Sequence, residues 1–134
     1  MNIAQKLTGL CDRFAVCMLK RPQSSHDGLS ILSLRALALI HLRETPLTMK
    51  QLASQLSVHL PNATLIVDKL EAESYVRRQH DDQDKRVVHV YLTEKSQKFL
   101  QAHRDQHLGL MTDALDTLSP AEQQAVLHFF EQCV

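Results

Sequence analysis

The chain has 134 residues, 44% of them hydrophobic, which is enough for the buried core of one domain. Aromatic residues make up 4%, a composition that suits packed helices better than a β-sandwich. Lys and Arg number 15, as do Asp and Glu, so there is no basic surplus for tight, non-specific DNA binding. No apolar run is long enough for a membrane span and no signal-peptide segment is present, so we expect a cytoplasmic protein without a membrane partner.

The N-terminal part predicts two helices. Apolar residues spaced three and four apart indicate an amphipathic helix over residues 2–20, whose apolar stripe needs a partner. A loop rich in Pro, Ser and Gly follows at 21–28. Ser30 can cap a second helix from Ile31 to about Arg43, and this helix is so apolar that we expect it in the core.

Two shorter helices separated by a tight turn come next. Thr48 and Gln51 fit the capping box S/T-x-x-E/Q, which predicts a third helix over residues 48–56. Ser57 and Val58 form the turn, and a fourth helix then spans about residues 60–73. Its inward face carries Ala63, Ile66, Val67 and Leu70. The opposite face, free to enter a groove, carries Asn62, Leu65 and Lys69, with Thr64 and Asp68 beside them.

A β-hairpin follows the fourth helix. Two strand-like runs within residues 77–93 flank a short charged tip, and apolar residues alternate with a period of two along the second run. The clustered carboxylates of this tip lack the Gly and distal Glu of a calcium loop, so a solvated hairpin tip explains them better. The order helix, turn, helix, hairpin is that of a winged helix-turn-helix, a DNA-binding unit.

The C-terminal part predicts a long helix over residues 94–116 and a last helix opened by the capping box of Ser119 and Glu122. The fold class is therefore mainly α with a small β-wing. One domain contains a winged helix-turn-helix head at 29–93 and dimerisation helices at 1–28 and 94–134, which pair with their copies in a homodimer.

Two sequence motifs resemble those of the MarR family of bacterial transcription regulators, and the likeness covers nearly the whole chain. The wing signature D-x-R, an alternating strand and L-T-x-K is matched by residues 84–86 and 92–95, and the family's Q-L-A and V-D-x-L-E are matched by residues 51–53 and 67–71. The resemblance implies a homodimer that binds double-stranded DNA at a pseudo-palindrome, with Arg86 in the minor groove and Asp84 holding that arginine or a partner on the fourth helix. An alternative is that this pair is a surface salt bridge that only closes the hairpin.

The candidate DNA-binding residues lie on the fourth helix and at the wing tip: Pro61, Asn62, Thr64, Leu65, Lys69, Gln83, Asp84, Lys85 and Arg86. Two positions depart from the family pattern. Leu65 stands where relatives often have a basic residue, and it could contact a thymine methyl group instead. Ser74 stands where the family usually has Gly, in a turn that needs a left-handed residue, which Ser adopts at a cost of about 1 kcal/mol.

Histidines and cysteines offer two candidate sensors. His103 and His107 lie four apart on the long helix, a spacing that suits two ligands of one metal ion. Their position resembles that of a histidine pair in zinc-responsive relatives, and His41 or His26 could contribute a further ligand. The alternative is a pair of histidines without a metal. Cys11 resembles the reactive cysteine of peroxide-sensing relatives, and Cys133 could meet Cys11 or Cys17 across a dimer; the alternative is three thiols without a sensory role. A small aromatic acid is the family's other kind of effector, and no cofactor is required.

The sequence thus predicts a transcription regulator, a repressor that binds its operator as a homodimer and is released by a small ligand, a metal or an oxidant. It contains no Gly-rich phosphate loop, HExxH or GxSxG motif, so we expect no enzyme activity. The alternative from another class is a winged-helix protein-interaction module that has lost DNA binding, which the neutral charge and Leu65 would favour.

Overall fold

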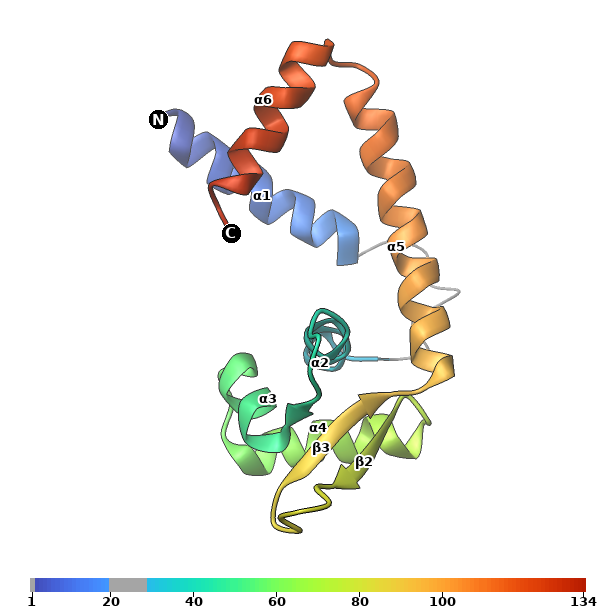
Figure 1. Cartoon of the computed structure of the whole chain (residues 1–134). Helices are drawn as coiled ribbons and strands as arrows, with labels where there is room; N and C mark the ends of the chain where they lie inside the picture. The colour runs from blue at the N-terminus through green and yellow to red at the C-terminus, as the bar shows by residue number, and fades with distance from the viewer. Residues whose placement is uncertain (1, 20–28) are drawn as a thin grey trace. The chain divides into compact units, whose positions relative to one another are not determined.

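The computed structural model describes the backbone of residues 2–19 and 29–134 and the side chains of 2–11 and 29–134. The chain forms two compact units. We call Lys20–Ala102 the head unit, and Met1–Leu19 together with His103–Val134 the terminal unit. Helix α5, Glu94–Leu115, begins in the head unit and ends in the terminal unit (Figure 1).

The head unit contains the predicted succession of helices and hairpin. In chain order its elements before α5 are α2 (Ile31–His41), β1 (Leu47–Thr48), α3 (Met49–Leu56), α4 (Leu60–Ala72), β2 (Val76–His80) and β3 (Val88–Leu92). The prediction of a mainly helical winged helix-turn-helix is confirmed. We call β2, β3 and the connecting residues 81–87 the wing, and the connecting residues the wing tip.

Side-chain caps define where these helices begin. The Ser30 hydroxyl accepts a hydrogen bond from the backbone N–H of Ser33 at the start of α2. Thr48 and Gln51 form the predicted capping box at the start of α3. Ser57 ends α3 in a left-handed conformation with φ 56°, which turns the chain sharply into α4.

The core of the head unit is aliphatic and joins all its elements. Helix α3 contacts α2 and α4, and α2 and α4 also contact the sheet. The buried side chains that pack together as the core cluster are Leu29, Ala36, Leu37, Ile40, Leu47, Leu52, Leu56, Val67, Leu70, Tyr75, Val76, Val90 and Phe99. These contacts fix the position of α4 relative to the wing.

The sheet has three strands rather than the two of the predicted hairpin. Its order is β1-β3-β2, and both pairs are antiparallel. Strand β1 pairs Leu47 with Val90. It was not predicted, because two residues are too few for an alternating pattern to be recognised.

The turn between α4 and β2 has the predicted left-handed residue, Ser74, with φ 65°. The next residue, Tyr75, is 1% exposed and packs edge-on against Phe99 of α5, with the ring centroids 5.7 Å apart. Thr93 Oγ1 donates a hydrogen bond to the Ser74 carbonyl at 2.6 Å, and Lys95 Nζ donates to the Glu73 carbonyl at 2.8 Å. The end of α4 is therefore tied to the beginning of α5.

The terminal unit contains α1 (Ile3–Leu19), the second part of α5 and α6 (Pro120–Glu131), close to the predicted ranges. Ser119 and Glu122 form the predicted capping box of α6, and hydrogen bonds from Ser119 lower the pKa of the Glu122 carboxyl. Large apolar side chains remain exposed here, Ile3, Leu7, Leu10, Leu108, Met111, Val126, Leu127, Phe129 and Phe130 among them. Among the described residues, no helix is both long and apolar enough to cross a bilayer.

Candidate nucleic-acid interface

Helix α4 has one buried and one exposed face, as its sequence predicts. Ala63, Val67 and Leu70 are fully buried. We call the opposite side the outer face; it presents Asn62, Leu65 and Lys69, with Pro61 exposed in the first turn. Thr64 is half-buried, and its hydroxyl donates to the Leu60 carbonyl at 3.0 Å.

At the wing tip, Arg86 is held by Asp84. The guanidinium donates from Nε to Asp84 Oδ1 at 3.0 Å and from Nη2 to Oδ2 at 3.2 Å, and the Arg86 backbone N–H donates to Oδ1 at 3.1 Å. These bonds lower the pKa of the Asp84 carboxyl. The Arg86 side chain is nevertheless 91% exposed, so its charge is oriented but remains open to solvent.

A second carboxylate, Asp81, organises the turn on which Arg86 sits. Its Oδ1 accepts from the backbone N–H groups of Gln83 at 2.8 Å and Asp84 at 3.0 Å, and its Oδ2 accepts from His89 Nε2 at 3.1 Å. These hydrogen bonds, led by the one from Asp84, lower the pKa of Asp81 from 3.8 to about 2. His80 Nδ1 donates to the Lys85 carbonyl at 2.8 Å and closes the tip from the other side. Gln83 and Lys85 are exposed.

A hollow of about 540 Å³ lies between the wing tip and the first turns of two helices. It brings Lys50 of α3 and Thr64 of α4 to the same concavity as Asp84 and Arg86. Its full lining is Thr48, Met49, Lys50, Leu60, Thr64, Asp84, Arg86, Val87 and Val88. Of the nine predicted residues, Thr64 of α4 and Asp84 and Arg86 of the wing tip line this hollow, and the other six do not.

Sequence reasoning missed Arg78, which joins α4 to β2. Its side chain, 26% exposed, donates from Nη1 to Glu71 Oε1 at 3.2 Å and from Nη2 to the Thr64 carbonyl at 3.3 Å and to Asp68 Oδ1. Its backbone N–H donates to Glu71 Oε2 at 2.9 Å. Arg78 thus neutralises two carboxylates of α4. The V-D-x-L-E motif contained both acidic partners, but no spacing rule linked them to a strand residue.

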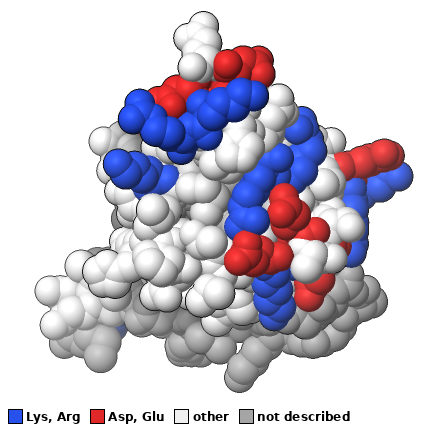
Figure 2. Space-filling view, turned by 90° about the horizontal axis from the view of Figure 1, so that it is seen from below, with Lys and Arg blue, Asp and Glu red and all other residues white. Residues whose placement is uncertain are grey.

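Acidic and basic groups are mixed on the face of the head unit that Figure 2 shows. Figure 2 views the molecule from the wing side and shows Lys and Arg beside Asp and Glu rather than in one basic stripe. Much of this mixing comes from the pairs Arg78 with Asp68 and Glu71, and Arg86 with Asp84. Arg77 lies over the Tyr91 ring, with its guanidinium carbon 4.4 Å from the ring centroid. The neutral total charge thus coexists with individual cations at defined positions.

The candidate metal ligands His103 and His107 lie side by side in the terminal unit. Their ring centroids are 4.2 Å apart at an interplanar angle of 61°. Among the residues that the structure describes, no group of three or more His, Cys, Asp or Glu side chains gathers as a metal site. His26 lies outside the described residues.

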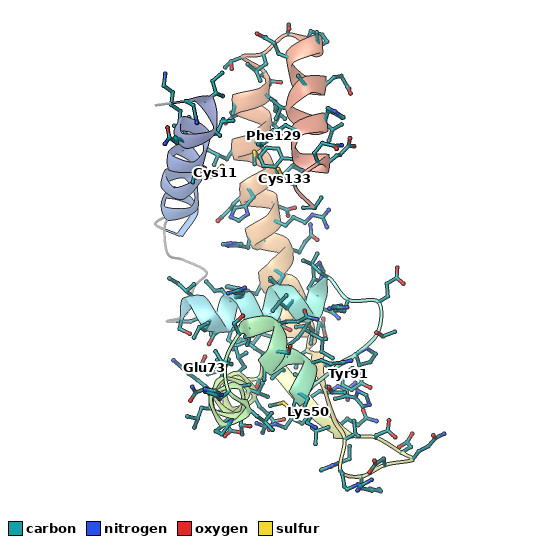
Figure 3. All side chains as sticks on the ribbon, turned by 90° about the vertical axis from the view of Figure 1, so that its left-hand side faces the viewer. Cys11, Lys50, Glu73, Tyr91, Phe129 and Cys133 are labelled. Atoms are coloured by element: carbon teal, nitrogen blue, oxygen red, sulfur yellow. The ribbon has the colours of Figure 1, made fainter. Side chains whose placement is uncertain are left out.

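Two of the three candidate redox residues are described, and both are exposed free thiols: Cys11 on α1 and Cys133 after α6. The side chain of Cys17 lies outside the described residues. Cys11 and Phe129 line an apolar groove of about 660 Å³ in the terminal unit (Figure 3). Its other lining residues are Leu7, Leu10, Met111, Ala125, Val126 and Phe130.

Several known proteins are similar to this chain in sequence. A family model described as MarR family matches residues 29–88. The uncharacterized HTH-type transcriptional regulator YkoM of Bacillus subtilis is 31% identical over 104 residues, which cover 78% of this chain and 67% of YkoM. The uncharacterized HTH-type transcriptional regulator YfiV of the same organism is 37% identical over 81 residues, which cover 60% of this chain and 50% of YfiV. The transcriptional repressor MprA of Escherichia coli is 40% identical over 50 residues, which cover 37% of this chain and 28% of MprA.

Solved structures share the fold over nearly the whole chain. A mutant of S. aureus MepR superposes with a TM-score of 0.81 at 15% identity, over 99% of this chain and 96% of that one. Streptococcus pneumoniae FabT in complex with DNA superposes with a TM-score of 0.73 at 24% identity, over 98% and 97%. At these identities the likeness shows the fold alone.

Proposed function

Because the chain belongs to the MarR family of transcription regulators, we propose that it binds a pseudo-palindromic DNA operator as a homodimer and represses transcription until an effector releases it. Each head unit places the outer face of α4 in the major groove and the wing tip in the adjacent minor groove. The protein is a regulator rather than an enzyme.

Arg86 is the observation that carries the DNA-binding proposal. Its guanidinium is 91% exposed at the tip of the wing and is oriented by two bonds to one carboxylate. A narrow A·T-rich minor groove concentrates negative potential on an inserted arginine. The alternative is that the pair of Asp84 and Arg86 only closes the hairpin. The turn is already held by the hydrogen bonds from the Gln83 and Asp84 backbone N–H groups to Asp81, so the pair is not needed for that purpose.

The homodimer proposal is supported by the terminal unit. Apolar side chains of α1, α5 and α6 line its groove and remain exposed in the single chain, including Phe129 at 43% and Phe130 at 51%. Exposed apolar surface of this kind is costly in water, and a second copy of the chain would cover it. Two joined head units would then present their α4 helices to successive turns of the major groove.

Repression is supported by the likeness to MprA, which is a transcriptional repressor. A zinc ion at His103 and His107, an oxidant at Cys11, Cys17 or Cys133, and a small aromatic acid are the three effectors that we propose to test.

The test of DNA binding is fluorescence anisotropy of the purified protein with duplexes selected from the DNA around its own gene. Selective binding that weakens steeply as salt rises is the expected result, because phosphate contacts release counterions. Arg86→Ala should weaken binding by about tenfold, the loss of one charge-assisted contact in the minor groove. Lys98→Ala is the matched control, because Lys98 is exposed on α5 and pairs with Glu94. Equal affinity of wild type and Arg86→Ala would contradict the role of the wing.

A second candidate function is protein interaction by a head unit that no longer binds DNA. The mixed charges and the exposed Leu65 favour it. In that case no duplex would be bound selectively even at low salt, although the dimer would be intact.

A further inference from the structure

One large apolar side chain stands on the outer face of α4. Leu65 is 66% exposed, whereas Ala63, Val67 and Leu70 of the same helix are 0% exposed. The core of the head unit does not use this side chain. An isolated exposed leucine needs no explanation by itself. This one lies on the helix that we propose enters the major groove, where its side chain would meet the edges of the bases.

The neighbours of Leu65 suit nucleic acid better than a protein partner. Asn62 and Lys69 flank it on the outer face, and Lys50 and Arg86 line the hollow beside the first turn of α4. The Asp68 carboxylate on the same helix is bound by Arg78, which reduces its repulsion of phosphates. The centre of a protein interface would instead group several apolar or aromatic side chains.

A leucine can neither donate nor accept a hydrogen bond. Among the base edges of the major groove, the apolar group is the C5-methyl of thymine, whereas cytosine presents an amino group that would lose its water against leucine. We therefore propose that Leu65 packs against a thymine methyl and selects thymine over cytosine at that position of each half-site. This inference rests on the proposed DNA-binding function.

The experiment replaces each thymine of the selected operator duplex, one at a time, by deoxyuridine. Deoxyuridine keeps every hydrogen-bonding group of thymine and lacks only the methyl. Replacement at one position per half-site should weaken binding about fourfold, the value of one buried methyl group. Replacement at thymines that do not meet Leu65 leaves that side chain's contribution unchanged.

Three variants assign the effect to the side chain. Leu65→Ala should bind the thymine duplex about fourfold more weakly and lose nothing further with deoxyuridine at that position. Leu65→Met retains apolar reach and should keep the response. Leu42→Ala is the matched control, because Leu42 is 78% exposed at the end of α2 in the same unit and should behave as wild type. Circular dichroism melting checks that each variant is folded.

Two results would overturn the inference and leave the proposed function intact. In the first, no thymine-to-deoxyuridine replacement weakens binding. In the second, the losses of affinity caused by Leu65→Ala and by deoxyuridine are independent and multiply at every position. Failure of the wild type to bind any duplex selectively at low salt would overturn the proposed function, and with it the role of Leu65. A sensitive position whose response disappears in Leu65→Ala would establish the contact.

Discussion

Arg78 shows how one side chain can connect α4 and the wing, the two parts of the head unit that we propose contact DNA. Its guanidinium joins β2 to Glu71, Asp68 and the Thr64 carbonyl of α4, and it is only 26% exposed. A partly buried cation with carboxylate partners contributes more to stability than an exposed surface pair. Its loss would also leave two carboxylates of α4 without their cation.

We expect Arg78→Gln to lower the free energy of unfolding by about 1–2 kcal/mol and to weaken operator binding as well. Urea denaturation and anisotropy measure the two effects. The matched control is Arg77→Gln, the neighbouring arginine, which is exposed and lies over Tyr91. Equal stability of the two variants would show that the Arg78 contacts do not hold α4.

The wing tip should respond to acid through Asp81. The pKa of Asp81 is about 2 in the folded protein against an ordinary value of 3.8, so its bonds to the tip stabilise the fold above about pH 4. That contribution is lost as the pH falls from about 4 to about 2. Amide chemical shifts of Gln83 and Asp84 in NMR spectra should therefore titrate with a midpoint near 2, and a midpoint near 3.8 would refute the assignment.

At neutral pH, Asp81→Ala should disorder the tip and reduce operator affinity several-fold, because Arg86 loses the turn that positions it. The control is Asp82→Ala, which removes the same charge from the next, exposed position. Similar losses in both variants would mean that charge rather than hydrogen bonding matters.

At the scale of the elements, left-handed serines end two successive helices. Ser57, with φ 56°, follows α3 and turns the chain into α4. Ser74, with φ 65°, follows α4 and turns the chain toward β2. A side chain in this conformation costs about 1 kcal/mol, which the surrounding hydrogen bonds and the burial of Tyr75 offset.

Ser74→Gly should therefore stabilise the protein by roughly 0.5–1 kcal/mol and raise the melting temperature by a few degrees. Ser54→Gly, at an exposed position inside α3, should do the opposite because glycine lowers helix propensity. Thermal unfolding followed by circular dichroism compares them. A destabilised Ser74→Gly variant would mean that the serine side chain makes a contribution larger than its conformational cost.

For the whole molecule, the central prediction concerns the apolar groove of the terminal unit. Val126 lines it from α6 and is 36% exposed. A carboxylate placed there would have to be desolvated in a dimer, so Val126→Asp should yield a monomer at micromolar concentration in light scattering. Operator affinity should then fall at least about tenfold, because the two half-sites are no longer bound together.

Gln124→Asp introduces the same charge at an exposed position of the same helix and should remain dimeric. If Val126→Asp is also dimeric and binds the operator normally, the groove is not the dimer interface.

The sequence by itself determined the order and type of the long elements, because capping boxes and apolar periodicity depend only on local spacing, as Thr48 and Ser119 show. It also placed Leu65 on the exposed face of α4, since the pattern of Ala63, Val67 and Leu70 defines the buried face, and it placed Arg86 at the charged tip of the hairpin. The resemblance of its motifs to those of the MarR family also indicated the family from the sequence.

Only the tertiary structure decided what depends on residues far apart in the chain. The strand β1 is too short to carry a pattern and exists because Leu47 pairs with Val90. The contacts of Arg78 with Asp68 and of Asp81 with His89 cross from one element to another, and their geometry follows from packing rather than from spacing. Local sequence patterns thus determine which helices and long strands form, and the packing of the core determines which charged side chains of different elements come into contact.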